Sequence, residues 1–155
     1  MVAPAYPLIN GHAYDHASAE IEVNGTIIIG IKEIGWSQSL EGAALRGTHA
    51  QVLARTRGEY DAEANLVMYM REYSELIESL TGGDASVGYG EQSFSIVVTF
   101  SEANQPIQVV RLLGCRIKGE ESGTSQGTDP TEDSIDLTVL QIERNGKRMV
   151  SNALI

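Results

Sequence analysis

The segment Arg55-Thr-Arg-Gly-Glu-Tyr-Asp-Ala-Glu-Ala-Asn-Leu66 alternates polar and apolar side chains from residue 59 onward. Successive side chains of a β-strand point to opposite faces, so this period of two predicts a strand with one polar face and one small or apolar face. The polar face carries the side chains of Glu59, Asp61, Glu63 and Asn65. Acidic side chains in a row repel one another unless water or opposite charge screens them. We therefore expect this face to be wet.

The preceding segment, Gly35-Trp-Ser-Gln-Ser-Leu-Glu41, alternates in the same way. Its polar face carries Ser37, Ser39 and Glu41. The residues between the two segments are too many for a tight turn. The sequence therefore predicts one long antiparallel hairpin over residues 34–66, with an extended tip over residues 42–56. We interpret the polar face of this hairpin as the lining of a water-filled channel in an oligomer.

A shorter hairpin is predicted before it. Residues 18–24 alternate, with Ile21 and Val23 on the inner face. The Asn24-Gly25 pair that follows favours a two-residue turn, because type I′ turns need positive φ angles. The next segment, residues 26–31, is β-branched and apolar on both faces. Such a strand is expected to be buried from both sides or covered by a partner.

The period changes after residue 66. Apolar side chains recur at spacings of three and four, which predicts an amphipathic helix over residues 69–81. The apolar stripe consists of Tyr69, Tyr73, Leu76, Ile77 and Leu80. The Gly82-Gly83 pair is expected to end the helix, because glycine adopts the left-handed conformation that closes a helix C-terminus.

The rest of the chain returns to the pattern of strands. Residues 1–16 are expected to form a proline-containing N-terminal arm, and residues 119–132 a flexible exposed loop rich in Gly, Ser, Thr and acidic residues. The loop lacks the spacing of an EF-hand calcium site. The predicted fold is a single domain (residues 1–155), mainly β in the α+β class. It has two packed antiparallel sheets, or a squat β-barrel-like sandwich, with one flanking helix and the long hairpin. The remaining strands are predicted over residues 91–101, 107–118 and 133–144.

The composition limits the classes of function. The net charge of −10 argues against a surface that grips nucleic acid or an anionic membrane, although nucleic acid could pass nearby without sticking. The single cysteine, Cys115, excludes an intrachain disulfide and a cysteine zinc site. No apolar run is long enough to span a bilayer, and no signal peptide is visible, so no membrane anchoring is expected.

Two histidines near the N-terminus raise the possibility of a metal site. His12 and His16 would share one face of a helix, with Asp15 nearby, and a metal-dependent enzyme could use them or the row of carboxylates. The flanking Gly11 and Pro7 disfavour that helix, so an ordinary surface segment is the stronger interpretation. Cys115 is expected to be a core residue, because no Cys/His or Ser/His/Asp arrangement supports catalysis. We predict no enzyme activity, no cofactor and no metal.

The basic residues lie apart from the acidic faces. Arg46, Arg55 and Arg57 flank the tip of the long hairpin. A basic tip could meet acidic loops of a neighbouring copy, which suits a heterologous, stacking assembly. The alternative is a solvated monomer surface, on which such charges contribute little. The pattern alone leaves both open.

Seven short motifs occur in order over nearly the whole chain. They are Gly11-His-Ala-Tyr14, Ser18-Ala-Glu-Ile21, Arg55-Thr-Arg-Gly-Glu-Tyr-Asp-Ala-Glu63, Gly88-Tyr-Gly-Glu91, Gly114-Cys-Arg-Ile-Lys118, Gln126-Gly-Thr-Asp129 and Arg144-Asn-Gly-Lys147. In this order they resemble the tail tube protein of tailed bacteriophages, most closely those with contractile tails. The specificity lies in the order of the motifs, since each of them is short.

The resemblance implies a structural virion protein that forms six-fold rings, which stack into a hollow tail tube. Each subunit would contribute strands to a continuous inner β-barrel, and the long hairpin would contact the next ring. The tube would hold the tape-measure protein and then conduct double-stranded DNA to the host, inside a sheath and between baseplate and tail terminator proteins. The expected location is the virion tail, after assembly in the host cytoplasm. The alternative is the tube of a bacterial contractile injection system, of the pyocin or type VI kind.

The resemblance also gives the polar residues a role. The candidates that face the lumen are Glu59, Asp61, Glu63, Ser37, Ser39 and Asp136. The candidates for ring stacking at the hairpin tip are Leu45, Arg46, His49, Arg55 and Arg57. Acidic rings along the lumen would repel DNA phosphates, so that DNA slides without a deep binding minimum. The family pattern supplies no catalytic residue.

Overall fold

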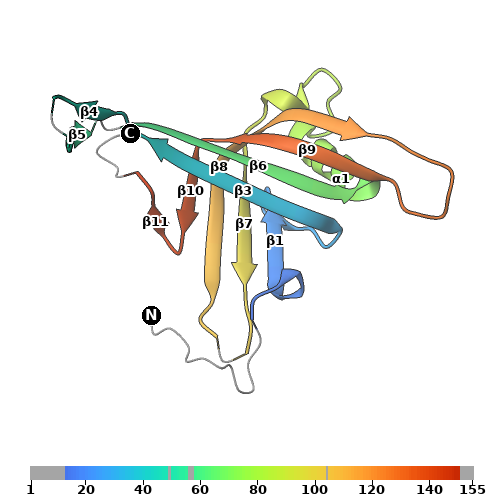
Figure 1. Cartoon of the computed structure of the whole chain (residues 1–155). Helices are drawn as coiled ribbons and strands as arrows, with labels where there is room; N and C mark the ends of the chain where they lie inside the picture. Colours follow the sequence, from blue (N-terminus) through green and yellow to red (C-terminus); the bar gives the residue numbers. More distant parts are fainter. Residues whose placement is uncertain (1–12, 49, 56–57, 104, 151–155) are drawn as a thin grey trace.

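A computed structural model describes residues 13–48, 50–55, 58–103 and 105–150 (Figure 1). The described chain is mainly β, its strand pairs are all antiparallel, and it contains one α-helix. This confirms the predicted class. The strands are β1 (Ala19–Val23), β2 (Thr26–Ile27), β3 (Ile31–Glu41), β4 (Ala44–Arg46), β5 (Val52–Arg55), β6 (Glu59–Tyr69), β7 (Phe94–Phe100), β8 (Gln108–Ser122), β9 (Glu132–Val139), β10 (Gln141–Arg144) and β11 (Lys147–Arg148).

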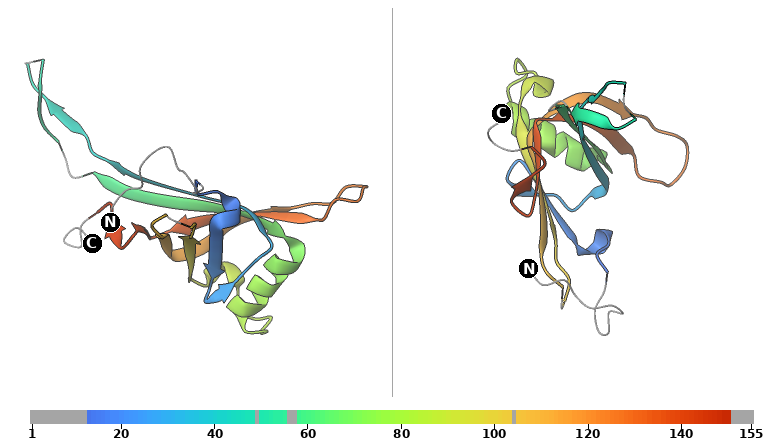
Figure 2. Two further views of the ribbon diagram at one scale, coloured as in Figure 1. Left: turned by 90° about the horizontal axis from the view of Figure 1, so that it is seen from below. Right: turned by 60° about the vertical axis from the view of Figure 1, so that its left-hand side comes forward.

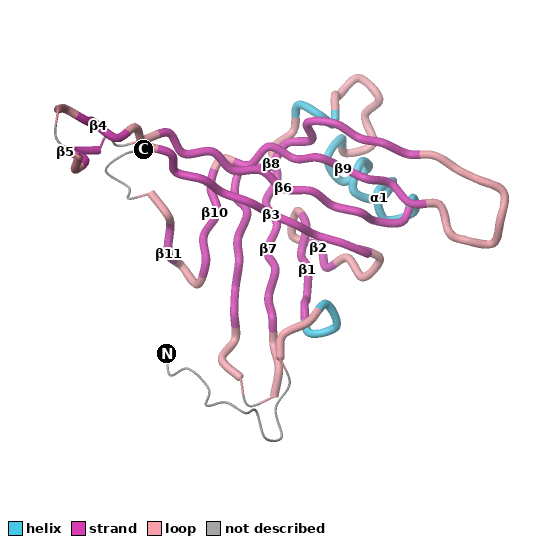
Figure 3. Tube along the Cα trace, in the orientation of Figure 1, coloured by secondary structure: helices cyan, strands magenta, loops and turns pink. Residues whose placement is uncertain are grey.

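The two predicted sheets are two halves of one continuous sheet, and β8 belongs to both (Figures 1 and 3). The order is β2-β1-β7-β8-β9-β6-β3, with β10 and β11 joined to β8 outside this path. The first part of β8 pairs with β7 and β10, whereas residues 116–122 pair with β9. Gly114 lies at this change of partners with a φ of 68°. A Cβ there would lie 2.6 Å from Leu140 Cδ1, so only glycine fits without a shift.

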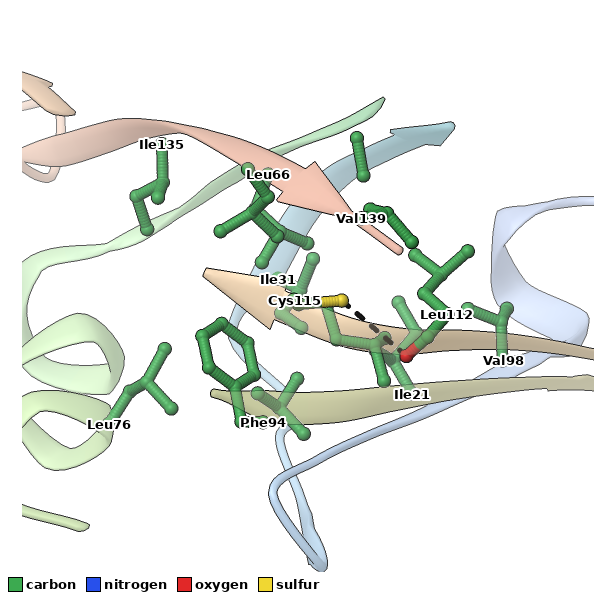
Figure 4. Packing of buried hydrophobic residues seen from close by; sticks show 14 of the residues in the cluster. Ile21, Ile31, Leu66, Leu76, Phe94, Val98, Leu112, Cys115, Ile135 and Val139 are labelled. Carbon is green, nitrogen blue, oxygen red and sulfur yellow. Dashed lines mark hydrogen bonds between the residues drawn. The ribbon is translucent and has the colours of Figure 1, made fainter. Parts of the chain in front are cut away.

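The core lies between the two halves (Figure 4). The inner face of β6 contributes Leu66 and Met68, which meet Ile96 of β7 and Ile135 of β9 in one buried cluster. Cys115 is also fully buried, and its thiol donates a hydrogen bond to the Leu112 carbonyl oxygen at 3.4 Å. Burial raises the pKa of Cys115 to about 12, so the thiol stays protonated at neutral pH. The predicted role of Cys115 as a core residue is confirmed.

The helix α1 (Met70–Thr81) covers the core from the side of β6 and β9 (Figure 2). Tyr73 and Leu76 of the predicted stripe are buried, and Gly82 ends the helix in the left-handed conformation with a φ of 62°. The predicted helix is confirmed, with its start one residue later. Two single-turn 3₁₀ helices complete the set, η1 (His16–Ser18) and η2 (Tyr89–Glu91). None of these described helices is long and apolar enough to cross a membrane.

Three local predictions need correction. The loop predicted over residues 119–132 begins later, because β8 continues to Ser122 in register with β9. The strand predicted over residues 133–144 is interrupted at Leu140, where the chain leaves β9 and enters β10 in the other half of the sheet. Within the subunit, residues 26–31 are not buried from both sides, because β2 is only two residues long and Ile27 and Ile29 are exposed; the alternative, that a partner covers them, stays a prediction. The first twelve residues of the predicted N-terminal arm lie outside the described chain.

Candidate functional site

The half of the sheet formed by β8, β9, β6 and β3 has a polar outer face. Pairing in register places Ser37 opposite Glu63, and Ser39 opposite Asp61. On the other side of β6, Asn65 lies opposite Asp136. All members of the predicted set are exposed on this one face: Glu59, Asp61, Glu63, Ser37, Ser39 and Asp136. The alternation on which the prediction rested is therefore present. That this face lines a channel stays a prediction.

Charge on the polar face is mostly negative. Residues two apart on a strand are about 7 Å apart, so two neighbouring carboxylates on β6 repel each other by about 0.6 kcal/mol in water. Glu41 lies directly opposite Glu59, which adds a like-charge pair across the strands. Such a face is stable only while it is hydrated. The carboxylates therefore do not mark a closed binding site.

Two basic residues of this face were not predicted from the sequence: Arg116, which is exposed opposite Thr138, and Lys118. A shallow groove of about 460 Å³ runs across the face, and Lys118 lines it together with Glu63 and Asp136. Lys118 lies at an irregularity in the pairing of β8 with β9, between Ile117 and Gly119. Alternation from Cys115 and Ile117 already directs Lys118 outward, but only the pairing of β8 with β9 assigns this side of the strand to the polar face.

The tip of the long hairpin is a separate two-stranded ribbon that extends away from the body (Figure 2). Its strands β4 and β5 pair only with each other among the described strands, and their residues are all exposed. Leu45, Arg46 and Arg55 of the predicted stacking set lie here. His49 and Arg57 of that set lie outside the described residues. Leu53 is 57% exposed and was not in the predicted set.

Two edges of the polar half have no strand partner within the described chain. β3 pairs only with β6, and residues 116–122 of β8 pair only with β9. An open edge presents unpaired N–H and C=O groups to which another chain can add. That a strand of another copy adds at these edges stays a prediction.

A cluster of hydrogen bonds around Glu120 connects α1 and η2 to β8. The Tyr73 and Tyr89 hydroxyls both donate hydrogen bonds to the Glu120 carboxylate, the second at 2.6 Å. Burial, followed by the hydrogen bond to Glu120, raises the pKa of Tyr73 well above its ordinary range. The hydrogen bond to Glu120 is the main cause that raises the pKa of Tyr89. Both phenols stay protonated near neutral pH, so the cluster fastens secondary structure and supplies neither a base nor a nucleophile.

The residues of the metal hypothesis have local structural roles. The Asp15 carboxylate accepts a hydrogen bond from the Ser18 amide at 3.0 Å and caps η1. His16 Nε2 lies 3.1 Å from the Ile31 carbonyl oxygen. His12 lies outside the described chain. Among the residues that the structure describes, no group of three or more His, Cys, Asp or Glu side chains could hold a metal ion.

Comparison with known proteins gives matches in structure alone. No protein-family model and no curated protein sequence matches the chain. A chain from the PVC sheath–tube complex of an extracellular contractile injection system, in its extended state, has a TM-score of 0.65 at 10% identity, covering 86% of this chain and 92% of that one. The SPP1 tail tube has a TM-score of 0.63 at 11% identity, covering 88% of this chain and 81% of that one. Hcp1 from Flavobacterium johnsoniae has a TM-score of 0.53 at 12% identity, covering 86% of this chain and 98% of that one. At these identities the likeness establishes a shared fold, so the chain has the tail-tube fold.

Proposed function

We propose that this chain is a structural tail tube protein, whose copies form rings that stack into a hollow tube for the passage of DNA. The observation that carries the proposal is the four-stranded half of the sheet, which is polar on its outer face and open at both edges. The shared fold with the SPP1 tail tube supports it. The proposed role is mechanical and needs no catalytic residue or cofactor.

The direction of the strands favours closure into a ring. Each strand of the polar half is antiparallel to the next, so β3 and β8 run in opposite directions at the two edges. When β3 of one subunit lies beside β8 of the next, the new pair is again antiparallel. A ring closed in this way is one uniform antiparallel barrel, and closure removes the edges that would otherwise aggregate. We infer six subunits in each ring from the family resemblance.

The outer face of the polar half would become the lining of that barrel. Its carboxylates, among them Asp61 and Glu63, would form closely spaced acidic rings. Such rings repel the phosphates of double-stranded DNA along the whole path, which keeps the DNA from binding tightly at any point. The tape-measure protein would occupy the same space before the DNA. Since α1 covers the opposite side of the sheet, it would lie on the outside, toward the sheath.

The hairpin tip would connect one ring to the next. It extends from the body, and Leu45, Arg46 and Arg55 are exposed on it. We assign stacking to these residues, together with His49 and Arg57. The ends of the stack would meet baseplate and tail terminator proteins. The proposed location is the virion tail, after assembly in the host cytoplasm.

A second candidate is the tube of a bacterial contractile injection system. It is favoured by the likeness to the PVC complex, to Hcp1 and to a type six secretion system protein, the last with a TM-score of 0.55 at 12% identity. The subunit would have the same faces and edges in either setting. The neighbouring genes separate the two: capsid and terminase genes indicate a phage, and effector genes without a capsid indicate an injection system.

Negative-stain electron microscopy of the purified protein across a concentration series tests the proposal. Hollow six-fold rings, and tubes at higher concentration, are the expected result. Particles without a central hole at every concentration would contradict it.

Two proline variants make this test specific for the edge of β3. Adjacent residues of a strand direct their N–H groups to opposite sides, so one of Ser39→Pro and Leu40→Pro removes a donor only from the open edge. The variant that loses only the outward N–H group should keep the wild-type midpoint of denaturant unfolding, because no hydrogen bond within the subunit is lost. It should nevertheless form no rings. If the variant that keeps wild-type stability still forms rings, the edge of β3 is not the seam.

A further inference from the structure

The end of β2 and the loop that follows it expose an isoleucine ridge, which consists of residues 27–29. Ile27 is 56% and Ile29 94% exposed, whereas Ile28 packs against the core and anchors the ridge. Grooves flank the ridge on both sides. One has a volume of about 270 Å³ and lies against α1; the other, of about 360 Å³, lies against η1 and β1. Exposed apolar surface next to grooves indicates an interaction surface.

The rim of the isoleucine ridge is acidic. Glu22 lies opposite Ile27 in the pairing of β1 with β2. Glu72 and Glu75 of α1 line the first groove, and the only base there, Arg71, lies 3.4 Å from Glu75. The Glu72 side chain lies directly over the backbone of Gly30, where a Cβ would lie 2.4 Å from its Cδ. The ridge therefore presents apolar side chains beside carboxylates of α1 and β1.

The hairpin tip has the complementary chemistry. Leu45, Val52 and Leu53 are large apolar side chains that are exposed on the tip. Arg46 and Arg55 accompany them, and no acidic residue occurs in residues 42–58. Apolar surface with a basic margin on the tip thus matches apolar surface with an acidic margin on the ridge.

The two surfaces lie at opposite ends of the same strand. The isoleucine ridge precedes the start of β3, and the tip follows its end (Figure 1). Eleven residues of extended strand separate them, which is about 35 Å at the rise of a β-strand. A subunit cannot reach its own ridge with its own tip. The partner that fits the ridge is a second copy, and a head-to-tail contact of this kind can repeat from one copy to the next.

We propose that the hairpin tip of one subunit binds the isoleucine ridge of a subunit in the adjacent ring. The inference rests on the proposed tube and goes beyond it, because it identifies the surface that receives the tip. The apolar side chains of the tip enter the grooves beside Ile27 and Ile29. Its arginines approach Glu22, Glu72 and Glu75.

Disulfide cross-linking tests the contact. The double variant Ile29→Cys/Leu53→Cys carries one thiol on the ridge and one on the tip, while the native Cys115 is buried and unreactive. A disulfide needs Cα atoms about 4.4–6.8 Å apart, so the two thiols of one subunit cannot join. Oxidation of the assembled protein should give a ladder of covalent multimers well beyond the dimer, since each subunit offers one tip and one ridge. Each single variant should stop at the dimer.

A matched control distinguishes a specific contact between ridge and tip from disulfides that form by random collision. Leu140 is 77% exposed and follows Val139, which pairs with Ala62, whereas the ridge precedes Ile31, which pairs with Met68 at the other end of β6. Leu140→Cys/Leu53→Cys should therefore give no ladder. Ladders of equal yield in both double variants would overturn the inference. Electron microscopy of the same samples separates the two proposals: tubes without a ladder from Ile29→Cys/Leu53→Cys overturn the ridge contact and leave the tube standing. Absence of both rings and ladder overturns both.

Discussion

The hairpin tip joins β3 and β6 at Glu41 and Gly58, and we call this junction the neck. A substitution at the neck tests whether it sets the direction of the tip. Gly58 has a φ of +87°, and a Cβ at this position would lie 2.4 Å from the carbonyl oxygen of Glu41, a backbone atom that cannot rotate away. In Gly58→Ala the two arms of the hairpin must therefore separate at the neck. Gly25→Ala is the matched control: its φ is +81°, but nothing lies within 4 Å of the added Cβ.

The expected losses of stability follow from these two geometries. An L-residue in the left-handed region costs about 1–2 kcal/mol. For a chain of this length that lowers Tm by roughly 2–8 °C, at about 2–4 °C per kcal/mol. Gly58→Ala adds the clash, but the neck can relieve it by opening the pair of Glu41 with Glu59, whose like charges oppose pairing. We expect both variants to lose similar stability.

Assembly should distinguish the variants. Gly25→Ala leaves the tip in place and should form tubes, whereas Gly58→Ala redirects the tip and should stop at single rings. The readouts are thermal unfolding of the dilute subunit and electron microscopy of the concentrated protein. Tubes from Gly58→Ala at the wild-type concentration would refute the argument that the neck positions the tip.

Three further substitutions probe the core, the tyrosine cluster and the polar face. Leu66→Ala removes a side chain with no exposed surface and should lower the free energy of unfolding by about 2–5 kcal/mol in a denaturant titration; a loss under about 1 kcal/mol would mean that β6 is not central to the core. Tyr73→Phe loses a hydrogen bond to a carboxylate, about 1.5 kcal/mol because Tyr89 still satisfies Glu120. Folding raises the pKa of Tyr73, so this stabilisation is complete below the unfolded pKa of about 10 and is lost as pH rises above it. The free energies of unfolding of the wild type and the variant should therefore converge at alkaline pH. A difference between them that does not change with pH would contradict the assignment. Asp61→Asn/Glu63→Gln removes a repulsion of about 0.6 kcal/mol, so the stability of the subunit should rise slightly and depend less on salt. The variant should still form tubes, with altered passage of DNA. Loss of tubes would exclude these side chains from the lumen.

Local patterns predicted much of the fold. The alternation along β6 identified both faces of the polar half, because a strand between two neighbours has no freedom to present its side chains otherwise. The stripe of Tyr73 and Leu76 located α1 for the same reason, since helical spacing brings these side chains to one face.

The features that the sequence did not reveal depend on contacts between distant residues. The apolar run in β8 indicated a strand, but its exchange of partners at Gly114 depends on Leu140, which lies far along the chain. Lys118 belongs to the polar face because the second part of β8 pairs with β9, which lies far along the chain. β-branched residues at positions 27 and 29 indicated burial, yet within the subunit no described element covers them.

The passage of β8 through both layers has a mechanical consequence. In a sandwich of two independent sheets, a shearing load can slide one layer over the other across side-chain contacts. Here the layers share a covalent backbone, so a pull on one layer reaches the other along β8, and sliding must break the hydrogen bonds of β8 with β9 or with β7. The subunit should respond to force as one stiff body. Compliance in a stack of such subunits would then reside in the contacts between them.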